Sequence, residues 1–209
     1  KALKFHKVKS VSCKFSGNKG FHIGVPFEAF PENVRNENIK NMFPDAPKKI
    51  ALYIKHMILG EFGERILNLE GEISKVLEKT GKKASEVLRK EKGKTEFNAD
   101  PILQMDTLLI SPRHLYRMPY SLHEKSGLVS MPLNPDKVLL FRKDFALPKN
   151  VRINSHRFLS RENVEKDEAK RLFVEAFDFH AKEDTQAGSD IKKEFEAPKT
   201  ALPEELFPP

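Results

Sequence analysis

The sequence has little of several features that define protein classes. It holds one cysteine, Cys13, and no tryptophan. A single cysteine excludes an internal disulfide and a cysteine-rich zinc site, and it is typical of a reducing compartment, so we expect a cytoplasmic location. No run approaches the roughly 18 apolar residues of a membrane span. No basic-then-apolar signal region opens the chain, so no membrane partner is expected.

Positive charge is what the chain does have. Lys and Arg number 37 against 30 Asp and Glu, which gives a formal net charge of +7. These residues are spread along the sequence rather than gathered in one block. The balance fits a nucleic-acid or nucleotide partner, and it fits a basic protein without such a partner equally well.

The spacing of apolar residues predicts an α+β fold. Alternation or clustering predicts strands, and a stripe at helical spacing predicts helices. The expected strands are 1–15, 21–25, 128–133 and 137–141, and the expected helices are 48–69, 72–79, 84–90 and 163–182. We expect a mixed or antiparallel sheet flanked by helices, with Val11, Cys13 and Phe15 facing inward on the first strand. Residues 1–183 are expected to form the core, 46–96 a helical insertion within it, and 184–209 a Pro-rich linker or tail.

The first polar motif is the turn between the two amino-terminal strands. Gly17 and Gly20 permit a positive φ or a close approach of the backbone. The inward-facing N–H groups of such a turn, together with Ser16, Lys19 and His22, suit a polyphosphate, because oriented amides and a cation favour dense negative charge. The alternative is an ordinary glycine hairpin with a solvated lysine.

A second polar cluster follows an apolar run. Asp106 is the lone carboxylate in that run, and if buried it must be hydrogen-bonded, paired or metal-bound. The alternative is that it caps a helix beginning at Thr107. The cluster that follows is dense in side chains able to bind phosphate, namely Arg113, Arg117, Ser121, His123 and Lys125. The alternative is that Arg117 and Lys125 are ordinary surface cations.

Taken in order and spacing, these segments resemble the archaeo-eukaryotic primase superfamily. Ser16-Gly17-Asn18-Lys19-Gly20-Phe21-His22 is similar to its Ser-Gly-x-(Arg/Lys)-Gly-x-His motif. Asp106 is similar to the carboxylate of its third motif, and the run from Arg117 through Ser121-Leu122-His123 to Gly127 is similar to the Arg-x-Pro-x-Ser-Leu-His-x-x-(Thr/Ser)-Gly run that follows. The resemblance covers about residues 4–140 and is to the catalytic small subunit of archaeal DNA primase.

The resemblance implies a DNA primase activity, the DNA-directed synthesis of short RNA primers by metal-dependent nucleotidyl transfer. It implies that Asp106 is a catalytic carboxylate that binds Mg²⁺ or Mn²⁺. The nucleotide-binding residues that it implies are Ser16, Gly17, Lys19, Gly20, His22, Arg117, Ser121, His123 and Lys125. The implied partners are a DNA template, nucleoside triphosphates, and a large regulatory subunit or fused iron–sulfur domain.

One departure from the family pattern bears on activity. The family's first motif, an Asp-x-Asp pair before the Ser-Gly turn, does not occur in this sequence. Two-metal transfer needs several carboxylates, so the chain is expected to be a fragment, inactive alone, or an inactive relative. The absent initial Met and the start on a strand pattern favour a fragment. A repair-type primase-polymerase, an end-joining polymerase module and a non-catalytic nucleotide- or nucleic-acid-binding relative remain alternatives.

Overall fold

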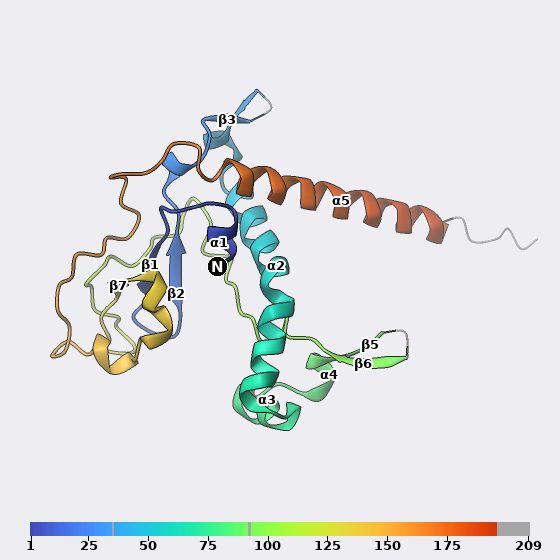
Figure 1. The fold of residues 1–209 in the computed structure, drawn as a ribbon, viewed down its shortest axis with the longest axis horizontal. Coiled ribbons are helices and arrows are strands. Elements are labelled where there is room, and N and C mark those ends of the chain that lie inside the picture. The colour runs from blue at the N-terminus through green and yellow to red at the C-terminus, as the bar shows by residue number, and fades with distance from the viewer. Residues whose placement is uncertain (35, 92, 196–209) are drawn as a thin grey trace, which may run out of the picture.

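The computed structural model describes residues 1–34, 36–91 and 93–195. Over these residues the fold is α+β, as predicted, with small antiparallel sheets and two long helices (Figure 1). None of the described helices is both long and apolar enough to cross a membrane. The helices are α1 Ala2–Phe5, α2 Asp45–Glu70, α3 Ile73–Thr80, α4 Ala84–Val87 and α5 Lys170–Phe195, with 3₁₀ turns η1 Phe27–Ala29, η2 Ile39–Met42, η3 Pro135–Leu140 and η4 Lys143–Ala146. The strands are β1 Ser12–Phe15, β2 Phe21–Gly24, β3 Asn33–Val34, β4 Glu37–Asn38, β5 Leu88–Glu91, β6 Lys94–Phe97 and β7 Met131–Leu133.

The central sheet has three antiparallel strands in the order β2-β1-β7. Lys14 pairs with His22 on one side and with Pro132 on the other, so these three residues share one face. The opposite face carries Phe15 and Phe21, which contact Phe141 after η3. Both faces of β1 are covered, and the prediction of a single inward face on this strand is therefore incomplete.

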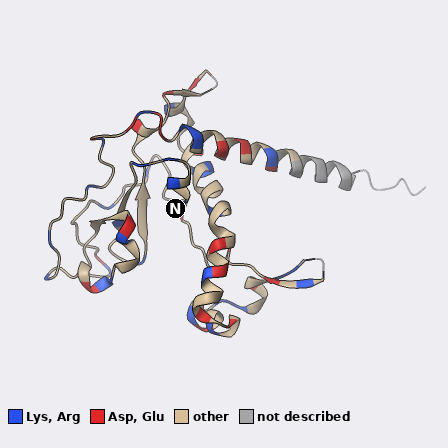
Figure 2. Cartoon of the chain, in the orientation of Figure 1, with Lys and Arg blue, Asp and Glu red and all other residues tan. Residues whose placement is uncertain are grey.

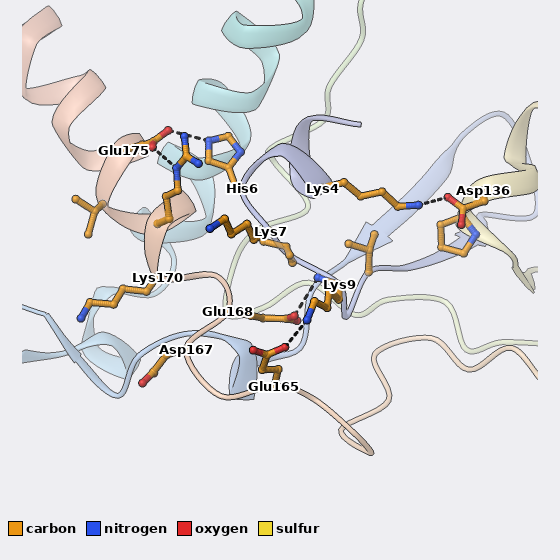
Figure 3. Close-up of a pocket in the computed structure, with 15 residues that line it drawn as sticks. Lys4, His6, Lys7, Lys9, Asp136, Glu165, Asp167, Glu168, Lys170 and Glu175 are labelled. Carbon is orange, nitrogen blue, oxygen red and sulfur yellow. Dashed lines mark hydrogen bonds and ion pairs between the residues drawn. The ribbon is translucent and has the colours of Figure 1, made fainter.

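The amino-terminal segment is helical before it becomes a strand, so the prediction of one strand over residues 1–15 is wrong in its first part. α1 is held by His6, which is completely buried. Its Nε2 lies 3.0 Å from the carboxylate of Glu175 (Figure 3). The same nitrogen lies 3.1 Å from the hydroxyl of Tyr53, and Nδ1 lies 2.8 Å from the carbonyl of Ala2. These bonds fasten α1 to α2 and α5, and the strand begins only at Ser12, where β2 and β7 supply partners.

The two long helices pack together, and α5 crosses α2 near its beginning (Figure 1). Leu172, Phe173 and Ala176 of α5 are buried in the shared core. The prediction that this helix begins at residue 163 is wrong, because Asn163 and Asp167 both have positive φ, which a right-handed helix does not allow. α5 runs to Phe195, through the first part of the expected tail, and residues 196–209 lie outside the described residues.

The segment predicted as a helical insertion, residues 46–96, holds most of α2, then α3, α4 and the hairpin of β5 and β6. The helix predicted for 84–90 ends at Val87, because the chain there enters the hairpin. Lys and Arg are interspersed with Asp and Glu over this segment (Figure 2).

The chain after β7 forms a 3₁₀ turn where a strand was predicted for 137–141. The Asn134 side chain accepts the N–H of Asp136 at 2.9 Å, and Pro135 occupies the first position of the turn. Both features initiate helical turns, and they replace the expected strand by η3. Phe141 then packs on the sheet through Phe15.

Candidate nucleotide-binding site

The Ser-Gly turn joins β1 to β2 and is held by its own hydrogen bonds. The N–H of Ser16 donates to the carbonyl of Gly20 at 2.9 Å. The hydroxyl oxygen of Ser16 accepts the N–H groups of Asn18 and Gly20, each at 3.3 Å. Lys19 is exposed on the turn. The turn is therefore preformed, with a lysine free to reach a ligand in solvent.

The two glycines of the turn have different structural roles. Gly17 has a φ of +91°, and a Cβ built on it would lie 3.0 Å from the Cβ of His123 and 3.4 Å from the carbonyl of Leu128. Glycine is thus required there by the backbone and by the close approach of the second motif. Gly20 has neither a positive φ nor a described neighbour within 4 Å of an added Cβ. The expectation that the turn geometry needs glycine is confirmed at Gly17 and not at Gly20.

The second motif lies in a long irregular segment between β6 and β7. An isolated bridge pairs Leu122 with Val129, and the N–H of His123 donates to the carbonyl of Leu128 at 2.8 Å. The Ser121 hydroxyl donates to the carbonyl of Met118 at 2.7 Å. These bonds close a compact loop that presents His123 toward the Ser-Gly turn.

Three contacts bring the two motifs together. The hydroxyl of Ser126 donates to the carbonyl of Gly17, across 109 positions of sequence. The ammonium of Lys14 donates to the carbonyl of Arg117, across 103 positions. The ring of Tyr116, which precedes Arg117 in the sequence, lies 5.5 Å from the ring of His22. The segment that contains Arg117 and His123 thus covers the Lys14 and His22 face of the sheet.

The cations of the second motif differ in availability. Arg117 donates to the carbonyl of Leu122 at 2.9 Å and to the carboxylate of Glu124 at 2.6 Å. Its guanidinium is therefore folded against its own loop, although a guanidinium has further N–H donors. Lys125 is exposed, and its backbone N–H donates to Nδ1 of His123 at 3.2 Å.

His22 is the predicted site residue with the most perturbed surroundings. Its pKa is lowered by burial first, then by the positive charges of Lys14 and His114, against a weaker opposing effect of Asp106. Nδ1 of His22 is buried and has no hydrogen-bond partner among the described residues. A neutral imidazole with an unsatisfied buried nitrogen is uncommon in a purely structural histidine.

Sequence reasoning missed Lys14, which is completely buried beside His22. The available signal was its position: it is a lone charge between Cys13 and Phe15 in an apolar strand. Alternation places it on the face opposite Cys13 and Phe15, and the register of β1 with β2 then sets it beside His22. Phe158, from the segment before α5, also reaches this face, 5.1 Å from the Lys14 ammonium.

The described residues alone do not fit the pair of metal ions that the resemblance implies. Asp106 is exposed, and its carboxylate accepts the N–H of Leu108 at 2.9 Å within a turn. The alternative that Asp106 caps a helix beginning at Thr107 is wrong, because residues 107–130 contain no helix. Over residues 1–34, 36–91 and 93–195, no three His, Cys, Asp or Glu side chains are grouped to hold a metal ion. One carboxylate cannot hold two ions.

A hollow of about 1090 Å³ lies away from this site, beside α1 and the start of α5 (Figure 3). Most of its charged side chains form ion pairs with one another: Lys4 with Asp136, Lys9 with Glu165 at 2.8 Å, and Arg171 with Glu175 at 2.6 Å. The basic and acidic residues that line it are balanced, so its charge does not favour an anionic ligand.

Comparison with known proteins assigns no family to the chain. No family model matches it, and neither a curated protein nor a solved structure matches it. The resemblance to the primase superfamily therefore depends on two motifs and their spacing.

Proposed function

We propose that this chain is the nucleotide-binding core of a DNA primase catalytic subunit, which holds a nucleoside triphosphate for DNA-directed synthesis of short RNA primers. The observation that carries the proposal is the packing of the Ser-Gly turn against the segment from Arg117 to Gly127. Two motifs more than 100 positions apart thereby form one cationic site. Such a site is suited to a triphosphate, because several cations and oriented N–H groups meet at one place.

The roles of the residues follow from their contacts. Lys19, exposed on the turn, neutralises phosphate oxygens as a mobile point charge. Arg117 donates to phosphate through the N–H groups that its own loop does not use. His22 and His123 supply hydrogen bonds, and Gly20 lets phosphate approach the backbone. Ser16 and Ser121 hold the shapes of the two turns through bonds that they already make.

The chemical step of the proposed activity lies beyond what these residues supply. Primer synthesis requires Mg²⁺ or Mn²⁺, and Asp106 is a single exposed carboxylate, so no step through a metal is derived for this chain. Triphosphate binding needs no such set, because cations and N–H groups suffice. A DNA template, and a large regulatory subunit or fused iron–sulfur domain, are the partners that accompany this proposal.

Equilibrium binding of ATP tests the proposal. Lys19→Ala and Arg117→Ala are each expected to weaken binding by about tenfold or more, because each removes a charge from the phosphate site. Lys149→Ala is the matched control, because Lys149 is exposed and outside both motifs. Failure of the wild-type chain to bind ATP, or equal binding by all four proteins, contradicts the proposal.

Synthesis on single-stranded DNA separates this function from its rivals. Product without a primer supports a DNA primase, and product only from a primer or gap supports a repair-type polymerase. ATP binding without any product supports the second candidate, a non-catalytic nucleotide-binding relative. That candidate is favoured by one observation, the lack of a three-ligand metal group among the described residues.

A further inference from the structure

Lys14 is a completely buried lysine that lacks an acidic partner. Its side chain has 0% exposure, and among the described residues no carboxylate forms an ion pair with it. Buried lysines are rare, and they are ordinarily paired with a carboxylate, because moving a charge out of water is costly. A buried ammonium that lacks such a pair requires a specific reason.

The surroundings of Lys14 are partly compensating and partly repulsive. Its ammonium donates to the carbonyl of Arg117 and lies 5.1 Å from the ring centre of Phe158. The charged group that acts on it is another cation: burial and then the guanidinium of Arg117 lower the pKa of Lys14, and Lys14 in turn lowers the pKa of His22. The charged form is therefore held at a cost, beside the residues proposed to bind phosphate.

We propose that Lys14 belongs to the anion-binding machinery of this site, and that a polyphosphate group bound there supplies the counter-charge which the protein lacks. Lys14 acts as a positioning residue, because a side chain without exposure does not touch the ligand. Its hydrogen bond holds the backbone of Arg117 over β1. Its positive charge attracts the bound phosphate through a short distance of protein of low dielectric constant. The inference rests on the proposed function only for the identity of the ligand.

Lys14→Met is the informative variant, because it keeps a long apolar side chain and removes the charge. Met removes the desolvation cost of the buried ammonium, and this gain offsets the loss of the hydrogen bond to the carbonyl of Arg117. The free variant is therefore expected to unfold at the wild-type temperature or above, and to bind inorganic tripolyphosphate about tenfold more weakly. If Lys14 only ties β1 to the loop, the reverse is expected: Lys14→Met lowers the stability and leaves the affinity for tripolyphosphate unchanged.

Ser130→Ala is the matched control for that tie. Ser130 is also completely buried, and its hydroxyl donates to the carbonyl of Phe15 at 2.9 Å, so it joins the same two segments without a charge. Ser130→Ala is expected to lower the unfolding temperature and to keep wild-type affinity for tripolyphosphate. Lys14→Arg, which keeps the charge, is expected to bind more tightly than Lys14→Met.

Calorimetric titration with tripolyphosphate and thermal unfolding of the four proteins decide the matter. Weaker binding by Lys14→Met, at unchanged or raised unfolding temperature, supports the inference. Wild-type affinity in Lys14→Met overturns it, and so does a lower unfolding temperature of the free variant. A wild-type chain that binds tripolyphosphate but not ATP contradicts the proposed function and leaves this inference standing, whereas a chain that binds neither contradicts both.

Discussion

A substitution at Gly17 tests how the two motifs pack. Gly17 has a φ of +91°, where alanine costs about 1–2 kcal/mol. The added methyl would also lie 3.0 Å from the Cβ of His123, and overpacking of this kind costs about 1–3 kcal/mol. Gly17→Ala is therefore expected to lose about 2–5 kcal/mol of stability, or about 4–20 °C in unfolding temperature for a chain of this size.

Gly20→Ala is the matched control in the same turn. An alanine there meets no described residue within 4 Å and needs no positive φ. It is expected to be stabilising by about 0.4–1 kcal/mol, because alanine restricts the unfolded chain. If phosphate approaches the backbone at this position, Gly20→Ala also weakens ATP binding although the fold is intact.

Thermal unfolding followed by circular dichroism measures both variants, since the chain has no tryptophan to report by fluorescence. Gly17→Ala is expected to unfold well below the wild type, and Gly20→Ala at or slightly above it. If Gly17→Ala unfolds at the wild-type temperature, the turn does not pack against His123 as described, and the site as built here is wrong.

Three further predictions concern charge and pH. Arg117 forms an ion pair with Glu124, so Glu124→Gln is expected to tighten ATP binding severalfold. The change frees the guanidinium of Arg117 and removes a negative charge that repels phosphate, and weaker binding in a titration contradicts this. Burial raises the pKa of Cys13 to about 11, so a thiol reagent at pH 8 is expected to label Cys13 only when urea unfolds the protein. The free energy of unfolding is also expected to fall above about pH 8.5, because the thiol ionises there in the unfolded chain but not in the folded one. Fast native labelling contradicts the burial. A hydrogen bond from Arg171 lowers the pKa of Glu175, so the ionised carboxylate contributes stability above about pH 4.3, and this contribution is lost as the pH falls below that value. Glu175→Gln is expected to flatten the fall of the unfolding temperature between about pH 5 and pH 2, and an unchanged slope contradicts this role.

The long helix α2 and the hairpin around Gly17 could be predicted because their signals are local. A sustained apolar stripe specifies a helix, and a Gly-rich turn between two alternating runs specifies a hairpin. The start of α5 could not be predicted, because it is set by positive φ at Asn163 and Asp167, which apolar spacing does not report. Residues 135–140 form η3 rather than a strand because Asn134 caps the 3₁₀ turn. The sequence Asn134-Pro135-Asp136 is equally typical of a turn between two strands, so it did not distinguish the two structures.

The candidate site was partly predictable for a similar reason. Residue types suited to phosphate identified Lys19 and Arg117, and the resemblance assigned both to one site. The contacts of β1 that bring the two segments together are long-range, so the residue pattern alone did not specify them. Lys14 was missed because a lysine in a strand is ordinarily solvated, and its burial follows from Phe158, a residue far away in the sequence. The expected carboxylate Asp106 lies in an exposed turn, which its apolar neighbours did not indicate.

The histidine resonances offer the most direct test of whether the two motifs form one nucleotide site. ATP is titrated into the isotopically labelled chain while the ring signals of all seven histidines are followed by NMR, with assignments from single His→Gln variants. We predict that His22 and His123 shift together with one dissociation constant, while His56 on α2 and His180 on α5 do not move. Movement of only one of the first pair, or of neither in a folded protein, contradicts the account.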